Sequence, residues 1–200
     1  MKNKILAGLG ILVGVLAVAW IAATPTEKFK AGDTMPPLKL TNIHDAEVTI
    51  PNAQYKFIHL QFRRFAGCPI CNLHLQSVIQ RLPEIEAAGI HEVVIFHSPK
   101  ASLLPYQGKF PFDVIGDPEK KLYAQFGVGS SIFAILDVRA WPAIARGNSA
   151  KDKPTAEPEG GVLGLPADFL INAEGKIVAS HYGRHAYDQW SVDELLALAK

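Results

Sequence analysis

The chain has 200 residues, of which 48% are hydrophobic and 20% are charged, and its formal net charge is +1. A protein that binds nucleic acid normally carries a clear basic excess, so this near-neutral balance argues against DNA or RNA as a partner. Part of the hydrophobic excess is concentrated at the N-terminus. The remainder of the chain is long enough for one domain with a core of its own.

The N-terminus has the pattern of a membrane anchor. Residues 1–4 form a short basic head, and residues 5–23 follow without a charge. About 20 apolar residues can cross a bilayer as a helix, whereas the core of a signal peptide has only about 7–15. No small-x-small cleavage pattern ends the run, because Trp20 and Ile21 stand where small side chains are needed. We therefore expect residues 1–23 to be an uncleaved signal anchor with one transmembrane helix; cleavage and secretion are the alternative.

The anchor predicts where the rest of the chain lies. Basic residues beside a membrane helix usually stay in the cytoplasm, so Lys2 and Lys4 place the remainder on the periplasmic or extracellular side. We expect residues 24–34 to be a polar linker and residues 35–200 to be a single domain. The Lys-, Asp-, Glu-, Pro- and Gly-rich stretch 148–161 is typical of a solvated loop within that domain.

Hydrophobic periodicity predicts alternating strands and helices, closed by a hairpin and a last helix. Near-continuous apolar runs indicate strands covered on both faces, and Pro83 and Pro142 should kink or break the helices that contain them. We expect strands at 38–40, 47–50, 57–62, 92–96, 112–115, 168–171 and 176–179, of which the first two and the last two pair as hairpins. We expect helices from 69 to about 89, at 98–107 capped by Ser98, at 118–126 capped by Asp117, and at 193–199. An apolar insertion, 130–145, precedes the second hairpin. This order predicts an α/β domain with a mixed central sheet flanked by helices.

The apolar insertion 130–145 carries the basic residue Arg139 and is followed by Arg146. We expect it to cover the fold. The alternative is a lid that faces a membrane or a partner.

The only two cysteines lie where the first central strand feeds the following helix. We expect Cys68 at the N-cap and Pro69 at the first helical position, where its missing N–H is not needed. Free N–H groups and the positive end of the helix dipole stabilise a thiolate there. Cys71 is one turn further on, so Cys68 should be the nucleophile and Cys71 the resolving thiol. Arg63 and Arg64 are close enough in sequence to stabilise the thiolate.

Three stretches of the chain resemble one known family: residues 63–71 around the cysteines, residues 110–118 and residues 165–171. They resemble the peroxiredoxin-like branch of the alkyl hydroperoxide reductase/thiol-specific antioxidant superfamily, and the likeness extends over residues 34–200. The resemblance implies a thioredoxin-like fold and an oxidoreductase that acts on thiols and disulfides. The expected partners are a disulfide-bearing protein or a small thiol or peroxide as substrate, and a redox donor protein.

The same resemblance assigns a role to Leu165 and Pro166, which precede the strand 168–171. A proline at this place cannot donate to the sheet. In redox proteins of this architecture it follows a cis bond, packs against the active disulfide and leaves a backbone edge free for a partner. We therefore expect a cis Leu165–Pro166 bond beside Cys68 and substrate docking along that edge.

The resemblance departs from the peroxiredoxin pattern at the expected active site. Peroxiredoxins carry a Thr or Ser three residues before the peroxide-attacking Cys and a Pro four residues before that; here these positions hold Phe65 and Gln61. The hydroxyl that orients a peroxide is therefore missing. We expect thiol–disulfide exchange as the function, with a thiol-dependent peroxidase as the alternative.

The two cysteines also allow other roles. A structural disulfide between Cys68 and Cys71 would close a loop with only two intervening residues and add little stability. A structural zinc site needs four ligands, and haem attachment needs a His where Asn72 stands. Membrane-anchored copper chaperones share the thioredoxin-like fold, so a copper-binding assembly factor using His74 as a third ligand is a further alternative. We expect His74 to be exposed on its helix, and no metal or cofactor.

Overall fold

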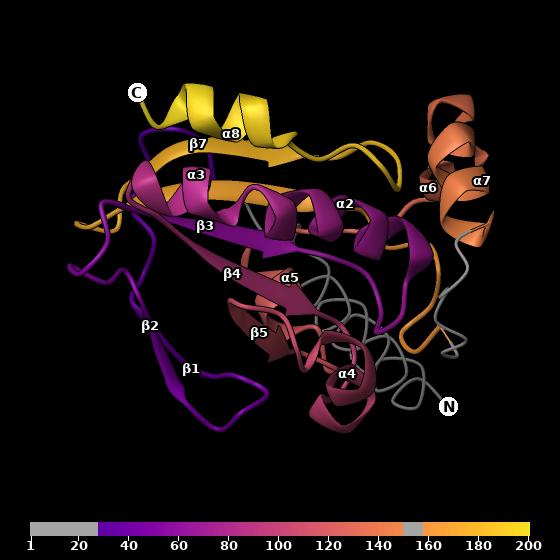
Figure 1. The fold of residues 1–200 in the computed structure, drawn as a ribbon, viewed down its shortest axis with the longest axis horizontal. Helices are drawn as coiled ribbons and strands as arrows, with labels where there is room; N and C mark the ends of the chain where they lie inside the picture. The colour runs from indigo at the N-terminus through magenta and orange to yellow at the C-terminus, as the bar shows by residue number, and fades with distance from the viewer. Residues whose placement is uncertain (1–27, 150–157) are drawn as a thin grey trace, which may run out of the picture.

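The computed structural model describes residues 28–149 and 158–200, and its elements follow nearly the order that the sequence predicts (Figure 1). The strands are β1 (Leu38–Thr41), β2 (Glu47–Ile50), β3 (Phe57–Phe62), β4 (Ile90–Phe96), β5 (Asp113–Gly116), β6 (Ala167–Asn172) and β7 (Ile177–Tyr182). The helices are α2 (Pro69–Gln80), α3 (Leu82–Ala87), α4 (Lys100–Gln107), α5 (Lys121–Gln125), α6 (Phe133–Leu136), the 3-10 helix η1 (Val138–Ala140), α7 (Trp141–Ser149) and α8 (Val192–Leu198).

Strand β3 is the centre of a five-stranded sheet with the order β5-β4-β3-β6-β7. It pairs in parallel with β4 and antiparallel with β6, and β6 continues into the antiparallel partner β7. The expected α/β architecture with a mixed central sheet flanked by helices is confirmed. Because β3 has a neighbour on each side, the loop that follows it starts from a rigid position at the sheet's end.

One face of the sheet packs on the β1–β2 hairpin and α5. Its centre is Phe62, whose ring centroid is 5.1 Å from those of Tyr123 and Phe126 and 5.8 Å from that of Phe169. All four side chains are buried. Alternation along β3 turns Ile58 and Leu60 to the same side as Phe62, because successive strand residues point to opposite faces.

The opposite face is covered by α2, α3 and α8; in Figure 1, α2 and α3 run along β3 and β6, and α8 runs along β7. Val78 of α2, Ile85 of α3 and Leu195 of α8 pack there against Leu170 of β6. The predicted bend near Pro83 is present as a break between α2 and α3 at Arg81. The N-terminus of α2 therefore reaches the end of β3 that leads into the cysteine segment.

The described part of the predicted linker 24–34, from Lys28 on, contacts the domain. The ring of Phe29 packs at a tilt against that of Phe126, with 5.1 Å between their centroids, and the Gly32 amide donates to the Ile177 carbonyl over 2.9 Å. These residues thus already belong to the fold. The predicted anchor, residues 1–23, lies outside the described residues, and none of the helices within 28–149 and 158–200 is long and apolar enough to span a bilayer.

Two helix starts lie later in the chain than predicted, and only one of the two predicted capping side chains caps its helix. The hydroxyl of Ser98 accepts the Ala66 amide over 2.9 Å instead of capping its own helix, and α4 begins after Pro99. The carboxylate of Asp117 accepts the Lys121 amide over 3.0 Å, so it binds the start of α5, but this start lies three residues later than predicted.

The insertion is divided into α6, η1 and α7 instead of being one helix broken at Pro142. Pro142 is the second residue of α7, where a helix does not use its N–H, so it begins a helix and does not end one. Helix α7 lies beside the start of α2, with Gly147 directly against Pro69. The insertion therefore covers the segment that carries the cysteines.

Truncation of the central aromatic cluster should destabilise the fold strongly. We expect Phe169→Ala to lower the free energy of unfolding by about 3–5 kcal/mol, because it leaves a cavity between β6 and α5. The matched control is Val178→Thr on the neighbouring strand, which keeps a β-branched side chain at an exposed position and should cost less than about 1 kcal/mol. Urea unfolding of both variants measures the difference. A loss for Phe169→Ala no larger than that of the control would contradict this view of the core.

Candidate redox site

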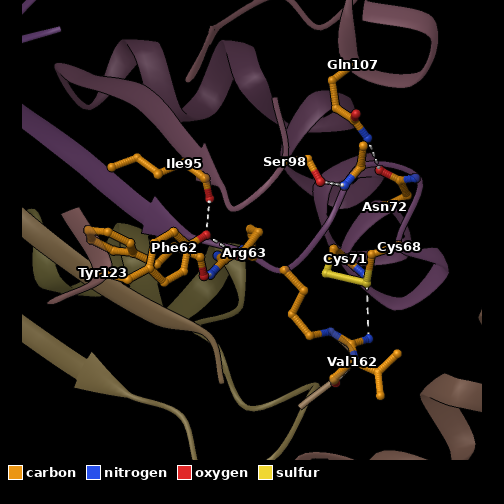
Figure 2. The surroundings of a disulfide bond; sticks show 12 residues. Phe62, Arg63, Cys68, Cys71, Asn72, Ile95, Ser98, Gln107, Tyr123 and Val162 are labelled. Carbon is orange, nitrogen blue, oxygen red and sulfur yellow. Dashed lines mark hydrogen bonds between the residues drawn. A yellow bond between two sulfur atoms is a disulfide. The ribbon is translucent and has the colours of Figure 1, made fainter. Parts of the chain in front are cut away.

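The two cysteines lie at the turn from β3 into α2, as predicted. Gly67 has a φ of +66°, a left-handed conformation that glycine adopts without strain, and this turns the chain into the helix. Cys68 is the N-cap of α2 with Pro69 after it, and its sulfur accepts the Cys71 amide over 3.3 Å. Cys68 and Cys71 form a disulfide, with their Cα atoms 5.3 Å apart (Figure 2). The arrangement places a redox-active pair on the positive end of a helix.

Arg64 holds a positive charge against the Cys68 sulfur. Its Nη2 donates to Cys68 Sγ over 3.1 Å, and its Nη1 donates to the Val162 carbonyl over 2.9 Å. The guanidinium lies 5.5 Å from the ring centroid of Phe65. Burial lowers the pKa of Arg64 to about 10, which leaves it charged at neutral pH. A thiolate on Cys68 would therefore meet both a helix amide and a fixed cation.

Arg63 does not contact the cysteines. In Figure 2 it lies with Phe62 and Tyr123, apart from the disulfide. Its Nη2 donates to Asp168 Oδ1 over 2.6 Å, and the whole side chain is buried. Of the two arginines predicted to stabilise the thiolate, only Arg64 is in position to do so.

Arg63 belongs to a buried ionic network between the central sheet and α2. His59 Nδ1 lies 2.8 Å from Glu92 Oε2, and His59 Nε2 lies 3.2 Å from Asp168 Oδ1. Gln61 connects the His59–Glu92 pair to the Arg63–Asp168 pair, since its side-chain amide donates to Glu92 and its side-chain carbonyl accepts from Arg63. With His59 protonated, two cations balance two carboxylates, which is the condition under which buried charges are tolerated.

The network holds a proton on His59. Burial opposes the charged imidazole, but Glu92 and Asp168 outweigh it and raise the pKa of His59 to about 9. Burial would likewise favour a neutral Asp168, but Arg63 and His59 hold the pKa of that carboxyl well below its usual range. Both groups therefore stay charged at neutral pH.

His74 is buried, which corrects the expectation that it is exposed on its helix. Its Nε2 lies 3.3 Å from Arg63 Nη2, so it adjoins the ionic network. Burial and the nearby charge of Arg63 lower the pKa of His74 to about 3 and keep it neutral. In the described part of the chain, no group of three or more His, Cys, Asp or Glu side chains is placed to hold a metal ion.

The ionic network was missed from the sequence, although a signal exists. His59, Gln61 and Arg63 alternate along and just beyond β3, and alternate residues share one face of a sheet. When every second residue of a strand is polar and the neighbouring strands are almost entirely apolar, the polar residues indicate a buried polar cluster. Their partners cannot be named without the register, which sets His59 opposite Glu92 and Gln61 opposite Asp168.

The expected cis Leu165–Pro166 bond is wrong: the only cis bond within residues 28–149 and 158–200 is Ile50–Pro51. The backbone at this place is already paired. The Leu165 amide donates to the Gly129 carbonyl over 3.1 Å, and the Pro166 carbonyl accepts the Gly183 amide over 2.9 Å. These two bonds occupy part of the backbone edge at Leu165 and Pro166, where the resemblance implied substrate docking.

A small pocket of about 190 Å³ with a mainly apolar lining was not predicted from the sequence, and Gly164 in its wall lies next to the Arg64 side chain. His97 and Lys120 line it, and neither ring nitrogen of His97 has a hydrogen-bond partner among the described residues. Burial and the charge of Lys120 lower the pKa of His97 to about 4, so the ring is neutral at physiological pH.

The disulfide is covered in this state. Cys68 is 0% exposed and Cys71 is 4% exposed. Ala143 and Gly147 of α7 lie over this region, and a Cβ added at Gly147 would meet the backbone of Pro69 at 3.0 Å. A molecule in solution can reach the Cys68 sulfur only after part of this cover moves.

A comparison with protein-family models gives a match over residues 77–185, which is more than half of the chain, to a family described as AhpC/TSA antioxidant enzyme. The matched segment begins after both cysteines. No curated protein matches the chain.

Solved structures with a similar fold include two peroxiredoxins and one thiol:disulfide interchange protein. Peroxidoxin BcpB from Mycobacterium tuberculosis is 16% identical with a TM-score of 0.63, covering 86% of this chain and 96% of its own. The reduced 2-Cys peroxiredoxin of Plasmodium vivax is 14% identical with a TM-score of 0.61, covering 86% and 80%. A putative thiol:disulfide interchange protein DsbE from Chlorobium tepidum is 18% identical with a TM-score of 0.57, covering 87% and 100%. At these identities the likeness shows a shared thioredoxin-like fold.

The buried ionic network predicts a specific dependence of stability on pH. The pKa of His59 is raised in the folded state, so its stabilising charge is fully present below about pH 6.5 and is lost as the pH rises through about 9. We expect the free energy of unfolding to fall by roughly 2–3 kcal/mol across this window, because one pKa unit corresponds to about 1.4 kcal/mol. Urea unfolding at stepped pH measures this fall, and NMR titration of the imidazole measures the pKa.

The variant His59→Gln is the control, since it should remove the pH dependence over the same window and serves to assign the NMR signal. An imidazole that titrates near pH 6.5, or a slope that persists in His59→Gln, would contradict the assignment of the proton to His59.

Proposed function

The chain belongs to the AhpC/TSA antioxidant enzyme family and is an oxidoreductase that acts on thiols; within this class, we propose that it is a thiol–disulfide oxidoreductase whose redox group is Cys68–Cys71. The observation that carries the proposal is the environment of the Cys68 sulfur. It accepts the Cys71 amide at a helix start and a charged hydrogen bond from Arg64. Both contacts favour a thiolate, which is the nucleophile of disulfide exchange.

The reaction proceeds in two exchange steps. In the reduced protein the Cys68 thiolate attacks one sulfur of a substrate disulfide, forms a mixed disulfide and releases the other substrate sulfur as a thiolate that takes up a proton. The Cys71 thiol then loses its proton and attacks Cys68 Sγ, which forms the Cys68–Cys71 disulfide and releases the second substrate thiol. Two electrons pass to the substrate, and a dithiol donor protein returns them by the reverse exchange.

Two buried residues favour a disulfide over a peroxide as the substrate. Phe65 is buried three residues before Cys68 and lies against Arg64, so no hydroxyl is present there to orient a peroxide. Gln61 is committed to the ionic network. Exchange with a disulfide needs no such hydroxyl, because sulfur is both the atom attacked and the leaving group.

The setting of the enzyme is the second part of the proposal. We propose that residues 5–23 anchor the chain in a membrane and that the domain faces the periplasmic or extracellular side. The supporting observations are the uncharged run and the basic residues Lys2 and Lys4 before it. A disulfide-bearing protein or small disulfide on that side would be the substrate.

The choice between disulfide and peroxide can be tested directly. We expect the reduced protein to react faster with glutathione disulfide or a protein disulfide than with hydrogen peroxide, in stopped-flow measurements of tryptophan fluorescence. The variant Cys71→Ser should accumulate a mixed disulfide on Cys68 that mass spectrometry identifies, because the resolving thiol is missing. The matched variant Cys68→Ser should accumulate none. A peroxide rate far above the disulfide rate would restore the peroxidase alternative.

The contact between Arg64 and Cys68 makes a second prediction. We expect Arg64→Gln to raise the pKa of the Cys68 thiol by about 1 unit or more, since an adjacent opposite charge typically shifts a pKa by 1–3 units. The reduced state loses stability, so the reduction potential should become more negative, by about 30 mV for each 1.4 kcal/mol. Thiol alkylation as a function of pH and equilibration with glutathione measure the two quantities.

Arg81→Gln is the matched control, because it removes the same charge at the opposite end of α2, where Arg81 pairs with Glu84 and Asp193. It should leave the thiol pKa and the potential unchanged. Equal effects of the two variants would show that net charge, and not the contact with Cys68, sets the reactivity.

A further inference from the structure

The insertion exposes a group of large apolar side chains. Each of them is more than half exposed, although large apolar residues on a soluble domain are mostly covered. We call this group the insertion face, and its members are Ile132, Phe133, Leu136, Val138 and Trp141.

The insertion face is the outer side of an ordered segment. The inner side of the same segment is buried through Ala134, Ala140 and Ala143, so α6, η1 and α7 are amphipathic as a unit. The indole Nε1 of Trp141 donates to the Ile135 carbonyl over 3.3 Å, which lays the ring against α6. The exposed apolar side chains are thus carried by a segment that the fold holds in place.

The chain enters the fold beside this surface. Lys28, the first described residue, lines a groove together with Phe133, Arg139 and Leu165. Four residues separate Lys28 from Ala23, the last residue of the uncharged run. Because an extended residue spans at most about 3.6 Å, Lys28 lies within about 18 Å of the end of that run.

We propose that the insertion face rests on a lipid bilayer, with its apolar side chains in the interfacial region; this rests on the proposed anchoring by residues 5–23. The short connection to Lys28 forces this side of the domain to stay close to the membrane surface. Trp141 has the amphipathic ring that is enriched at such interfaces. Arg139 and Arg146 are exposed on the same segment and suit anionic headgroups, although Arg139 is shared with Asp137 through a 2.8 Å bond.

Tryptophan quenching by brominated lipid tests the proposal in the full chain. The chain has three tryptophans, so Trp20→Phe combined with Trp190→Phe leaves Trp141 as the only reporter. The matched control, Trp20→Phe with Trp141→Phe, leaves Trp190, which packs at 5.8 Å on His59 near the start of α8, away from α6 and α7 in Figure 1. Both proteins are reconstituted in phosphatidylcholine–phosphatidylglycerol vesicles with and without bromine on the upper acyl chain, and flotation is measured first.

We expect both proteins to float with the vesicles, Trp141 to lose about half of its fluorescence to brominated lipid, and Trp190 to lose little, because an interfacial face inserts only about 5–10 Å. Flotation without quenching of Trp141 would overturn the lipid contact while the anchor stands. Shielding of Trp141 from aqueous acrylamide without lipid quenching would overturn it in favour of a protein partner or a second copy. Equal quenching of both tryptophans would also overturn it, and failure to float would remove the anchor together with this inference.

Discussion

The alternation of side chains at the end of strand β3 is the constraint on which the site depends. Arg63 and Arg64 are neighbours in sequence, but the pleat sends them to opposite sides. Arg63 enters the interior and neutralises Asp168, whereas Arg64 reaches the Cys68 sulfur. A register slip of one residue would exchange them, leaving a buried carboxylate without its cation and the sulfur without its donor. The ionic network and the redox pair are therefore positioned by the same strand.

This arrangement also separates stability from reactivity. In the ionic network of His59, Glu92, Asp168 and Arg63, the positive and negative groups pair with one another. The network is therefore a rigid support for the helix α2 that packs on it. The charge of Arg64 is directed at the Cys68 sulfur, where it would stabilise a thiolate in the reduced protein. The helix amide adds to it from the other side. Replacing a residue of the network should therefore lower the free energy of unfolding, whereas replacing Arg64 should change the thiol pKa and the reduction potential.

The sequence predicts the strands, the closing hairpin and the position of Cys68 at a helix start, because these features depend on local periodicity and capping. The sequence does not predict features that depend on which distant segments contact each other in the fold. His74 is buried because it faces Arg63 between α2 and the sheet. The Ser98 hydroxyl accepts a hydrogen bond from the Ala66 amide, which belongs to another loop. The cis bond expected at Pro166 came from resemblance and failed, since the backbone there is paired with neighbouring loops.

The departure from the peroxiredoxin pattern has a structural reason in this chain. The position at which that pattern carries a proline is Gln61, in the middle of the central strand, where its side chain joins Glu92 to Arg63. A proline there could neither make those bonds nor donate its amide within a strand that is paired on both sides. The ionic network and a peroxiredoxin-type strand end therefore exclude each other at this residue. The chain has the network, and the buried Phe65 stands in place of the hydroxyl. Both features support the proposed preference for a disulfide over a peroxide.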